Sequence, residues 1–133
     1  MYLIDSSAWI EYLRRTGSRA DSEVTRLVHA PGSVAITEPV IMELLAGARG
    51  ARDFRGLSAM TSALPLMAVE AVCDYPEAAA IYKLLRYSGL TVRSLVDCLI
   101  AAVAMRRDAT VVHSDADFDV IASRLPLKVL SLL

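Results

Sequence analysis

Short apolar stretches alternate along the chain with longer segments in which apolar residues recur at helical spacing. Apolar stretches of a few residues are typical of strands that are buried on both faces of a sheet. Five of them are predicted as strands, over Tyr2–Ile4, Ser33–Ile36, Leu66–Val69, Thr110–His113 and Lys128–Leu132. The segments between them are predicted as helices, over Ala8–Arg15, Ser22–Ala30, Pro39–Arg49, Arg52–Leu64, Pro76–Ser88, Leu95–Arg107 and Asp117–Arg124.

Start and stop signals agree with these boundaries. Thr37 precedes Pro39 at a predicted helix start, and Gly89 follows a predicted helix end. Strands that alternate with helices predict a parallel sheet that is covered by helices on both faces. The chain of 133 residues has the length of one domain and contains no linker, repeat or low-complexity segment. We therefore expect a single α/β domain over residues 1–133.

The composition is apolar for a soluble protein, because 55% of the residues are hydrophobic and the mean hydropathy is +0.44. Such a chain has either a large core or an apolar surface that a partner covers. Its longest apolar run, Leu99 to Met105, is far shorter than the ~20 residues that span a bilayer. The N-terminus does not have the pattern of a signal peptide, and we expect Cys73 and Cys98 to be reduced core thiols in a cytoplasmic protein.

Carboxylates follow several of the predicted strands. Asp5 follows the first strand, Asp115 and Asp117 follow the fourth. Glu43 lies about one turn into a helix, and Asp97 lies in the first turn of the helix in "RSLVDCLIAAVAM". Ligands bind to open parallel sheets beyond the carboxyl ends of the strands. We therefore expect these carboxylates to belong to one site.

Each carboxylate also has an ordinary structural interpretation. The acids that follow strands could only cap the next helices. Asp97 could be the acidic member of a capping box with Ser94. Glu43 could lie at the edge of the apolar face of its helix and reach the solvent. These alternatives stay open for each residue taken alone.

Together, the carboxylates indicate a divalent cation. Carboxylates that gather without a counter-charge repel each other and raise each other's pKa. Ligand sets of oxygen atoms select hard ions such as Mg²⁺ or Mn²⁺ over Zn²⁺. The chain has only two histidines, His29 and His113, and no cluster of His and Cys that would predict a zinc site. His113 ends a strand beside the acids, and we interpret it as a structural histidine before a ligand or proton shuttle.

Four segments in order resemble PIN-domain ribonucleases, and within them the VapC-type toxins of bacterial toxin–antitoxin pairs. The segments are "LIDSSAWIEYL", "TEPVIMELLAGAR", "GLTVRSLVDCLIAAVAM" and "VVHSDADFDVIA", and the third is the most specific. The resemblance covers essentially the whole chain. It implies a single PIN-like domain with a parallel five-stranded sheet that is flanked by helices on both faces.

The resemblance also implies a site and an activity, namely RNA cleavage that depends on Mg²⁺ or Mn²⁺. The acidic quartet of the family falls on Asp5, Glu43, Asp97 and Asp115 as catalytic residues. Metal binding is expected at Asp5, Asp97, Asp115 and, as a further acid of some members, Asp117. Ser6 and Ser7 take the positions of hydroxyl groups that steady metal-bound water.

Partners follow from the same resemblance, which implies homodimerisation and inhibition by a VapB-type antitoxin in a hetero-oligomer. The net charge of −1 gives no global basic field, so RNA binding needs a local patch or a metal. Structured RNA such as tRNA is the expected substrate, with Arg86 and Arg93 as phosphate contacts beside the Asp97 helix. An apolar groove for an antitoxin helix is expected from Trp9, Tyr12, Leu13, Leu57 and Met60.

Two other classes of protein remain as alternatives at this point. A PIN-like fold could bind RNA or a partner with negligible catalysis, although the complete acidic quartet speaks against it. A phospho-receiver domain also binds Mg²⁺ with acids at strand ends, and it needs a Lys near its last strand. Lys128 begins the last predicted strand, and only Asp5 follows the first, which disfavours this class.

Overall fold

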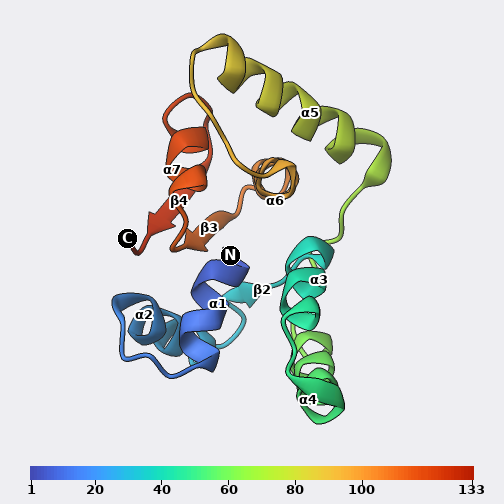
Figure 1. Ribbon diagram of the computed structural model, residues 1–133, viewed down its shortest axis with the longest axis vertical. Helices are drawn as coiled ribbons and strands as arrows, with labels where there is room; N and C mark the ends of the chain where they lie inside the picture. Colours follow the sequence, from blue (N-terminus) through green and yellow to red (C-terminus); the bar gives the residue numbers. More distant parts are fainter.

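The computed structural model describes residues Met1 to Leu133. A four-stranded parallel sheet lies at its centre (Figure 1). Its strands are β1 (Tyr2–Ile4), β2 (Val34–Ala35), β3 (Thr110–His113) and β4 (Lys128–Ser131), in the order β2-β1-β3-β4. The helices are α1 (Ser6–Leu13), α2 (Arg19–Val28), α3 (Glu38–Ala46), α4 (Gly50–Ser62), α5 (Ala71–Tyr87), α6 (Leu95–Arg106) and α7 (Ala116–Ala122).

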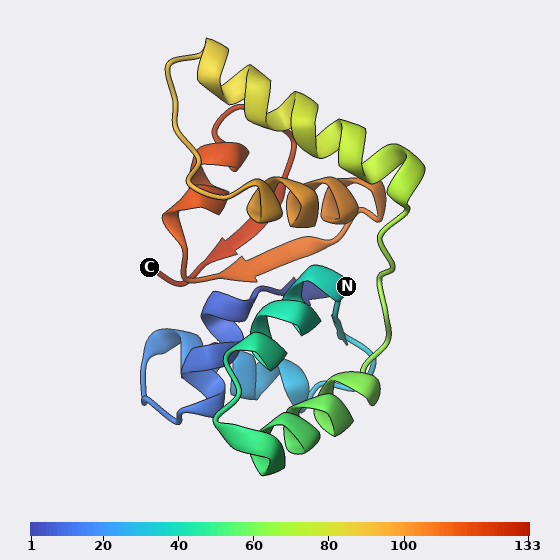
Figure 2. The same ribbon diagram turned by 45° about the vertical axis from the view of Figure 1, so that its right-hand side comes forward.

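The order of the strands places a topological switch between β1 and β3. The chain leaves β1 and returns on one side as β2, whereas β3 and β4 lie on the other side. Helices α1 to α4 gather around the first part, and α5 to α7 gather around the second (Figure 2). The carboxyl ends of β1 and β3 therefore lie side by side, which is where this class of fold binds ligands.

The predicted fifth strand, Leu66–Val69, is wrong except for one residue. Leu66 forms a single parallel bridge with Ile36, through hydrogen bonds of the Ile36 main chain with Pro65 O and Met67 N. The next main-chain groups bond to side chains instead of a strand. Ala68 O accepts from Arg106 at 2.8 Å, and Val69 N donates to Glu38 Oε1 at 2.9 Å. The ladder therefore ends after one residue.

The helix boundaries agree with the predicted ones within three residues, except at the start of α5. The sequence suggested that Pro76 opens this helix, but α5 begins at Ala71 and contains Pro76. The extra turn is held by Asp74, whose carboxylate binds Arg106 of α6 and accepts from the Glu70 N–H at 2.7 Å. A tertiary contact thus extends the helix beyond its local signal.

The core explains why α6 is apolar around its circumference. All residues from Cys98 to Ala104 are buried, because α6 packs against α3, α5, α7 and β3. Cys98 is thus a core thiol as predicted, whereas the same prediction is wrong for Cys73, which is exposed on α5. Consecutive residues of β3, from Val111 to His113, are also buried, as expected for a strand with both faces covered. No helix of this chain combines the length and the hydropathy needed to cross a membrane.

Candidate active site

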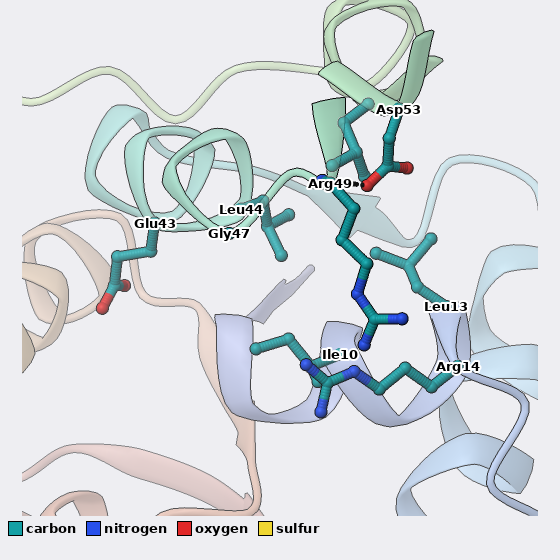
Figure 3. A pocket seen from close by; sticks show the side chains of 9 residues that line it. Ile10, Leu13, Arg14, Glu43, Leu44, Gly47, Arg49 and Asp53 are labelled. Carbon is teal, nitrogen blue, oxygen red and sulfur yellow. Dashed lines mark hydrogen bonds between the residues drawn. The ribbon is translucent and has the colours of Figure 1, made fainter. Parts of the chain in front are cut away.

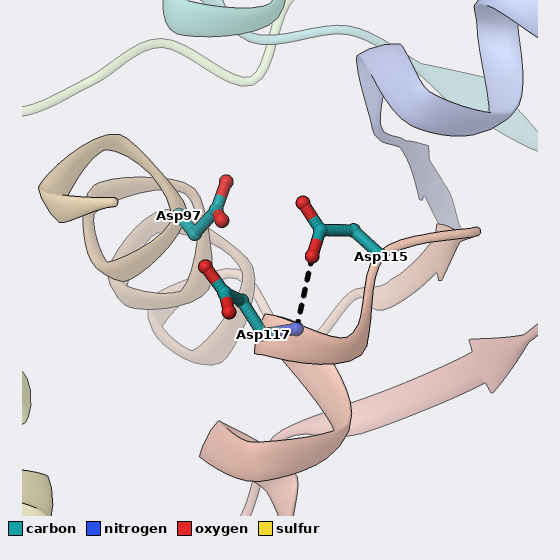
Figure 4. A group of neighbouring side chains, drawn as sticks. All are labelled: Asp97, Asp115 and Asp117. Carbon is teal, nitrogen blue, oxygen red and sulfur yellow. Dashed lines mark hydrogen bonds between the residues drawn. The ribbon is translucent and has the colours of Figure 1, made fainter. Parts of the chain in front are cut away.

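Three carboxylates meet where α6 and α7 begin. Asp97 projects from the first turn of α6, Asp115 caps α7, and Asp117 lies in the first turn of α7 (Figure 4). Each offers one carboxylate oxygen, and these oxygens lie within 4.8 Å of one another. The three residues come from two segments of the chain, and they form the most compact part of the predicted site.

Of the helix-capping roles that the sequence suggested for these acids, one is observed and one is not. Asp115 does cap its helix, because its Oδ1 accepts from Asp117 N at 3.0 Å. The capping box between Ser94 and Asp97 is absent. Ser94 Oγ accepts from Val96 N at 3.2 Å, and no hydrogen bond links the Asp97 carboxylate to Ser94. The carboxylate of Asp97 is therefore free to serve the site.

Asp5 lies at the carboxyl end of β1, next to this cluster, and only 2% of it is exposed. Its Oδ2 accepts from Ser7 N at 3.0 Å and from Ser7 Oγ at 2.6 Å. Ser7 Oγ in turn accepts from Ser114 N at 3.0 Å, which ties the end of β1 to the end of β3. The other oxygen, Asp5 Oδ1, is buried without a hydrogen-bond partner. Burial is the main cause that raises the pKa of Asp5, and the charge of Asp115 adds to it.

Glu43 completes the predicted quartet from α3, but it lies outside the group of three carboxylates. Its Oε1 accepts from Ser6 Oγ at 3.3 Å. Burial raises the pKa of Glu43, and the charges of Asp5 and Asp115 raise it further. The electrostatic coupling places Glu43 at the edge of the same site. Both Ser6 and Ser7 thus hold carboxylates of the site.

Asp97 carries the largest electrostatic penalty among these acids. Burial raises the pKa of Asp97 to about 8, a hydrogen bond with the Asp117 carboxyl contributes next, and the negative charges of Asp5, Asp115 and Asp117 add to the shift. The group is 5% exposed. Protonation of Asp97 near neutral pH is therefore one way in which the fold tolerates the cluster.

Arg93 lies at this site and contacts two of its carboxylates. From the sequence, it was predicted only as a contact for RNA phosphate. Its Nη2 lies 3.1 Å from Asp115 Oδ1, and its Nε lies 3.4 Å from Asp117 Oδ1. Its main-chain N–H also donates to Asp117 Oδ2 at 3.0 Å. These two carboxylates raise the pKa of Arg93. The expectation that the acids gather without a counter-charge is therefore only partly right, because Arg93, which lies just before α6, contacts two of them.

The donor set fits a hard divalent cation. Three carboxylate oxygens converge although Arg93 contacts two of the three carboxylates, and the buried Asp5 Oδ1 beside them has no protein donor. Oxygen ligands select Mg²⁺ or Mn²⁺ over Zn²⁺. His113 is fully buried and lies outside the group, so no imidazole or thiolate joins the set.

A cavity of about 620 Å³ lies between α1, α3 and α4 and shares Glu43 with the acidic site (Figure 3). It is partly the predicted antitoxin groove, since Leu13 and Leu57 line it. Trp9 does not line it, because it is 1% exposed in the core and packs edge-to-face on Tyr12. Met60 is absent from the lining as well. The remaining wall consists of Ile10, Arg14, Glu43, Leu44, Gly47, Arg49 and Asp53.

Arg86, the other predicted RNA contact, lies on α5 away from the acids. Its guanidinium carbon is 5.8 Å from the centroid of the Tyr82 ring. Together with Lys83 and Tyr87, these residues line a surface hollow of about 350 Å³. The hollow combines two cations with two aromatic rings, and no acidic residue lines it.

Comparisons with known proteins identify the family of this chain. The family model described as PIN domain matches residues 2–123. VapC ribonuclease Mb1587 of Mycobacterium bovis and ribonuclease VapC11 of Mycobacterium tuberculosis are each 49% identical to this chain over 123 residues, which are 92% of both partners in each comparison.

Solved structures share the fold at lower identity. A chain of the DNA-bound VapBC complex from Salmonella typhimurium is 18% identical, with a TM-score of 0.76 over 99% of this chain and 98% of that one. Mycobacterium tuberculosis VapC20, described as a sarcin-ricin loop cleaving toxin, is 21% identical, with a TM-score of 0.69 over 94% and 96%. The family match and the 49% identity to ribonucleases show that this chain belongs to the PIN domain family, among its VapC ribonucleases.

Proposed function

We propose that this protein is an endoribonuclease, the toxin of a type II toxin–antitoxin pair, and that it hydrolyses RNA phosphodiesters with Mg²⁺ or Mn²⁺. The observation that carries the proposal is the convergence of Asp97, Asp115 and Asp117 beside the unpartnered Asp5 Oδ1 at the switch point of the sheet. The 49% identical relatives, which are named as VapC ribonucleases, support the activity. Structured RNA such as tRNA is the substrate class that we propose.

In this mechanism the chain's own residues divide the work. Asp97, Asp115 and Asp117 would hold the cation, and Ser7 fixes the Asp5 carboxylate beside them through two hydrogen bonds. The cation supplies Lewis acidity that brings the pKa of water toward neutrality and offsets the charge that develops on the phosphate. Glu43, whose pKa is raised, holds a proton more readily than an ordinary Glu and gives it to the departing 3′ oxygen.

The deciding experiment incubates the protein with total tRNA in the presence of Mn²⁺ or EDTA and identifies the ends of the fragments. Hydrolysis by this route gives a 5′-phosphate and a 3′-hydroxyl and stops in EDTA. We expect Asp5→Asn to lower the cleavage rate by at least about 100-fold. Even groups that only support the ligands of a metal can contribute up to about that factor to activity. Cyclic 2′,3′-phosphate ends in EDTA contradict the mechanism, and no cleavage under any condition favours a binding module.

The phospho-receiver alternative is not supported. Its lysine must face the acids, but Lys128 begins β4 at the opposite end of the sheet. Its Nζ lies 2.7 Å from Asp108 Oδ1, a residue that precedes β3. The family match over residues 2–123 also assigns the chain to another family.

RNA contacts are proposed at two arginines with different surroundings. Arg86→Gln weakens binding of tRNA but leaves Mn²⁺ affinity unchanged, because Arg86 is distant from the acids and faces solvent beside Tyr82. Arg93→Gln instead strengthens Mn²⁺ binding several-fold, because its guanidinium contacts the oxygens of Asp115 and Asp117. Filter binding of tRNA in EDTA and calorimetry with Mn²⁺ alone measure the two effects separately. If tRNA binding and Mn²⁺ binding change by equal factors in both variants, the two arginines do not have these separate roles.

The cavity between α1 and α4 is proposed as the docking site of a VapB-type antitoxin. Apolar side chains such as Leu13 and Leu57 suit a helix, and the guanidinium groups of Arg14 and Arg49 turn into the same space (Figure 3). Neither arginine forms an ion pair within the chain, which favours an antitoxin segment with an acidic side chain among apolar ones. We also propose that the toxin forms a homodimer and acts in the cytoplasm.

Leu57→Glu tests the docking site, because it places a charge among the apolar walls. We expect the antitoxin to bind at least about 30-fold more weakly, since buried apolar anchors at interfaces can carry over 2 kcal/mol. RNA cleavage by the free toxin is retained. Val72→Glu on α5, where Val72 is 93% exposed, is the matched control. An antitoxin that inhibits both variants equally contradicts the location of the site.

A further inference from the structure

His113 is a buried titratable side chain next to the acidic site, and the proposed mechanism does not use it. It is the last residue of β3 and is fully buried. Its ring packs against Phe118 with a centroid distance of 5.2 Å. Its Nδ1 accepts a hydrogen bond of 3.1 Å from the main-chain N–H of Asp115. A core histidine is thus bonded directly to the main chain of a residue in the carboxylate cluster.

The other edge of the ring faces Asp119 of α7, although Nε2 itself forms no hydrogen bond. His113 Nε2 lies 3.2 Å from Asp119 Oδ1, and Ser131 Oγ donates to Asp119 Oδ2 at 2.9 Å. Ser131 is also the register partner of His113 in the β3–β4 pair. The bond from the Asp115 main chain and the packing on Phe118 therefore fix the ring, while Nε2 lies beside the Asp119 carboxylate.

These contacts define one tautomer of the imidazole. Nδ1 must carry a lone pair to accept from Asp115, so the single ring proton is on Nε2, where it faces Asp119. The ring has to be neutral for this arrangement, since a protonated imidazole has no acceptor. The same peptide N–H would otherwise be an unpaired donor at a half-buried helix start.

The constraint is transmitted to the site through a very short path. Asp115 is held at its main chain by His113, while its Oδ1 accepts from Asp117 N and from Arg93. With the main chain and Oδ1 both held, the orientation of the second carboxylate oxygen is determined. A rotation of the Asp115 peptide would break the cap of α7 and move two of the three converging carboxylates together.

We propose that His113 is a positioning residue of the acidic site, which holds the Asp115 main chain so that its carboxylate is aimed at a divalent cation. The relevance to RNA cleavage rests on the proposed function, whereas the effect on cation binding does not. Groups that orient metal ligands from outside typically contribute 10–100-fold to metal affinity. The same range is expected here, although His113 acts on the main chain of its target.

The test compares three variants by their binding of Mn²⁺ alone, without RNA. His113→Phe fills the space but has no acceptor, and Mn²⁺ affinity falls roughly 10–100-fold. In His113→Asn the amide oxygen can reach the position of Nδ1, and affinity stays within about threefold of the wild type because the acceptor is restored. In His113→Gln the amide reaches the position of Nε2 instead, and affinity falls as it does for Phe.

Two further measurements separate positioning from general loss of structure. In the metal-free protein, ¹⁵N spectra of the ring show a proton on Nε2 only, and the Asp115 amide is protected from hydrogen exchange except in the Phe and Gln variants. Ile81→Ala on α5 removes core packing far from the acids and serves as a control that lowers stability without weakening Mn²⁺ binding. If His113→Phe does not fold, the difference between Asn and Gln carries the test.

Several results overturn the inference. Equal Mn²⁺ affinity of the wild type and His113→Phe does so, and so does identical behaviour of the Asn and Gln variants. A ring proton on Nδ1 excludes the acceptor role outright. A wild type that binds Mn²⁺ but never cleaves RNA removes the proposed function and leaves the positioning role intact. A wild type that does not bind Mn²⁺ removes both.

Discussion

Asp97→Asn abolishes RNA cleavage and at the same time stabilises the metal-free protein at pH 8. The first effect is expected because Asp97 is one of the three converging carboxylates, and at least about a 100-fold loss follows from its removal. The second effect follows from burial and from the neighbouring charges, which raise the pKa of Asp97 to about 8. Asparagine keeps the shape of the side chain and lacks the charge.

The pH dependence has a definite sign. The pKa of Asp97 is raised in the folded state above its ordinary value of 3.8, so the folded protein holds this proton while the unfolded chain has lost it. The free energy of unfolding contributed by this group is therefore fully present below about pH 4 and declines as the pH rises to about 8. The advantage of Asp97→Asn over the wild type grows across the same interval and then levels off.

A divalent cation reverses the order of stability. A ligand present at 100 times its dissociation constant stabilises the folded state by about 2.7 kcal/mol. The wild type gains this amount from Mn²⁺, whereas the variant gains little because it lacks one carboxylate. Thermal melts from pH 4 to 9, in EDTA and in Mn²⁺, measure both effects. Glu77→Gln, at an exposed position of α5, is the control and changes neither.

Two outcomes contradict this account of Asp97. Asp97→Asn that melts below the wild type in EDTA at pH 8 shows that the carboxylate stabilises the fold by itself. Undiminished cleavage by the variant shows that the reaction does not need this group. A protein whose functional carboxylate costs stability until its cation binds is a common pattern, because functional sites tend to keep groups that the fold disfavours.

The position of the site was predictable from the sequence because it depends on local rules. Strands that alternate with helices predict a parallel sheet, and the carboxyl ends of such strands predict where Asp5 and Asp115 meet. The buried helix around Asp97 follows from its unbroken apolar composition. Three of the five predicted acids bring carboxylate oxygens within 4.8 Å of one another. Asp5 and Glu43 adjoin them.

What the sequence could not show depends on contacts between distant segments. Arg93 precedes its helix and meets Asp115 and Asp117 only in the folded chain, so no spacing rule indicates this ion pair. Trp9 has the apolar character of either a groove or a core, and only packing decides between them. The predicted fifth strand does not form for a similar reason. The side chains of Arg106 and Glu38 form hydrogen bonds with the main chain of Ala68 and Val69, in place of a neighbouring strand.

Arg106 links three segments of the chain, and its contacts indicate a large role in stability. Its Nη2 lies 2.7 Å from Asp74 Oδ2, and its Nε donates to Asp74 Oδ1 at 2.9 Å. It also donates to Ala68 O at 2.8 Å and contacts Glu70 at 3.3 Å. The Asp74 side chain is only 2% exposed. Arg106 thereby fastens the segment between α4 and α5, drawn in Figure 2 along one side of the molecule, to the end of α6.

Arg106→Met is therefore expected to destabilise the fold by about 3 kcal/mol, because the removal of one partner leaves a buried carboxylate without its cation. For a chain of this length the melting temperature falls by roughly 10 °C. Arg107→Met, at the exposed neighbouring position, is the control and changes the melting temperature by little. The double variant with Asp74→Leu recovers much of the loss, since apolar residues replace a buried pair at small net cost.

The pH dependence of this pair is opposite to that of Asp97. The hydrogen bonds from Arg106 lower the pKa of Asp74, so its contribution to stability is present above the ordinary carboxyl value and disappears as the pH falls below it. The gap between the wild type and Arg106→Met consequently narrows in acid. Arg106 and Asp97 lie at opposite ends of α6, so Mn²⁺ affinity at 20 °C is unchanged in the variant. A gap that does not narrow below pH 4, or a parallel loss of Mn²⁺ binding, shows that Arg106 acts on the fold in another way.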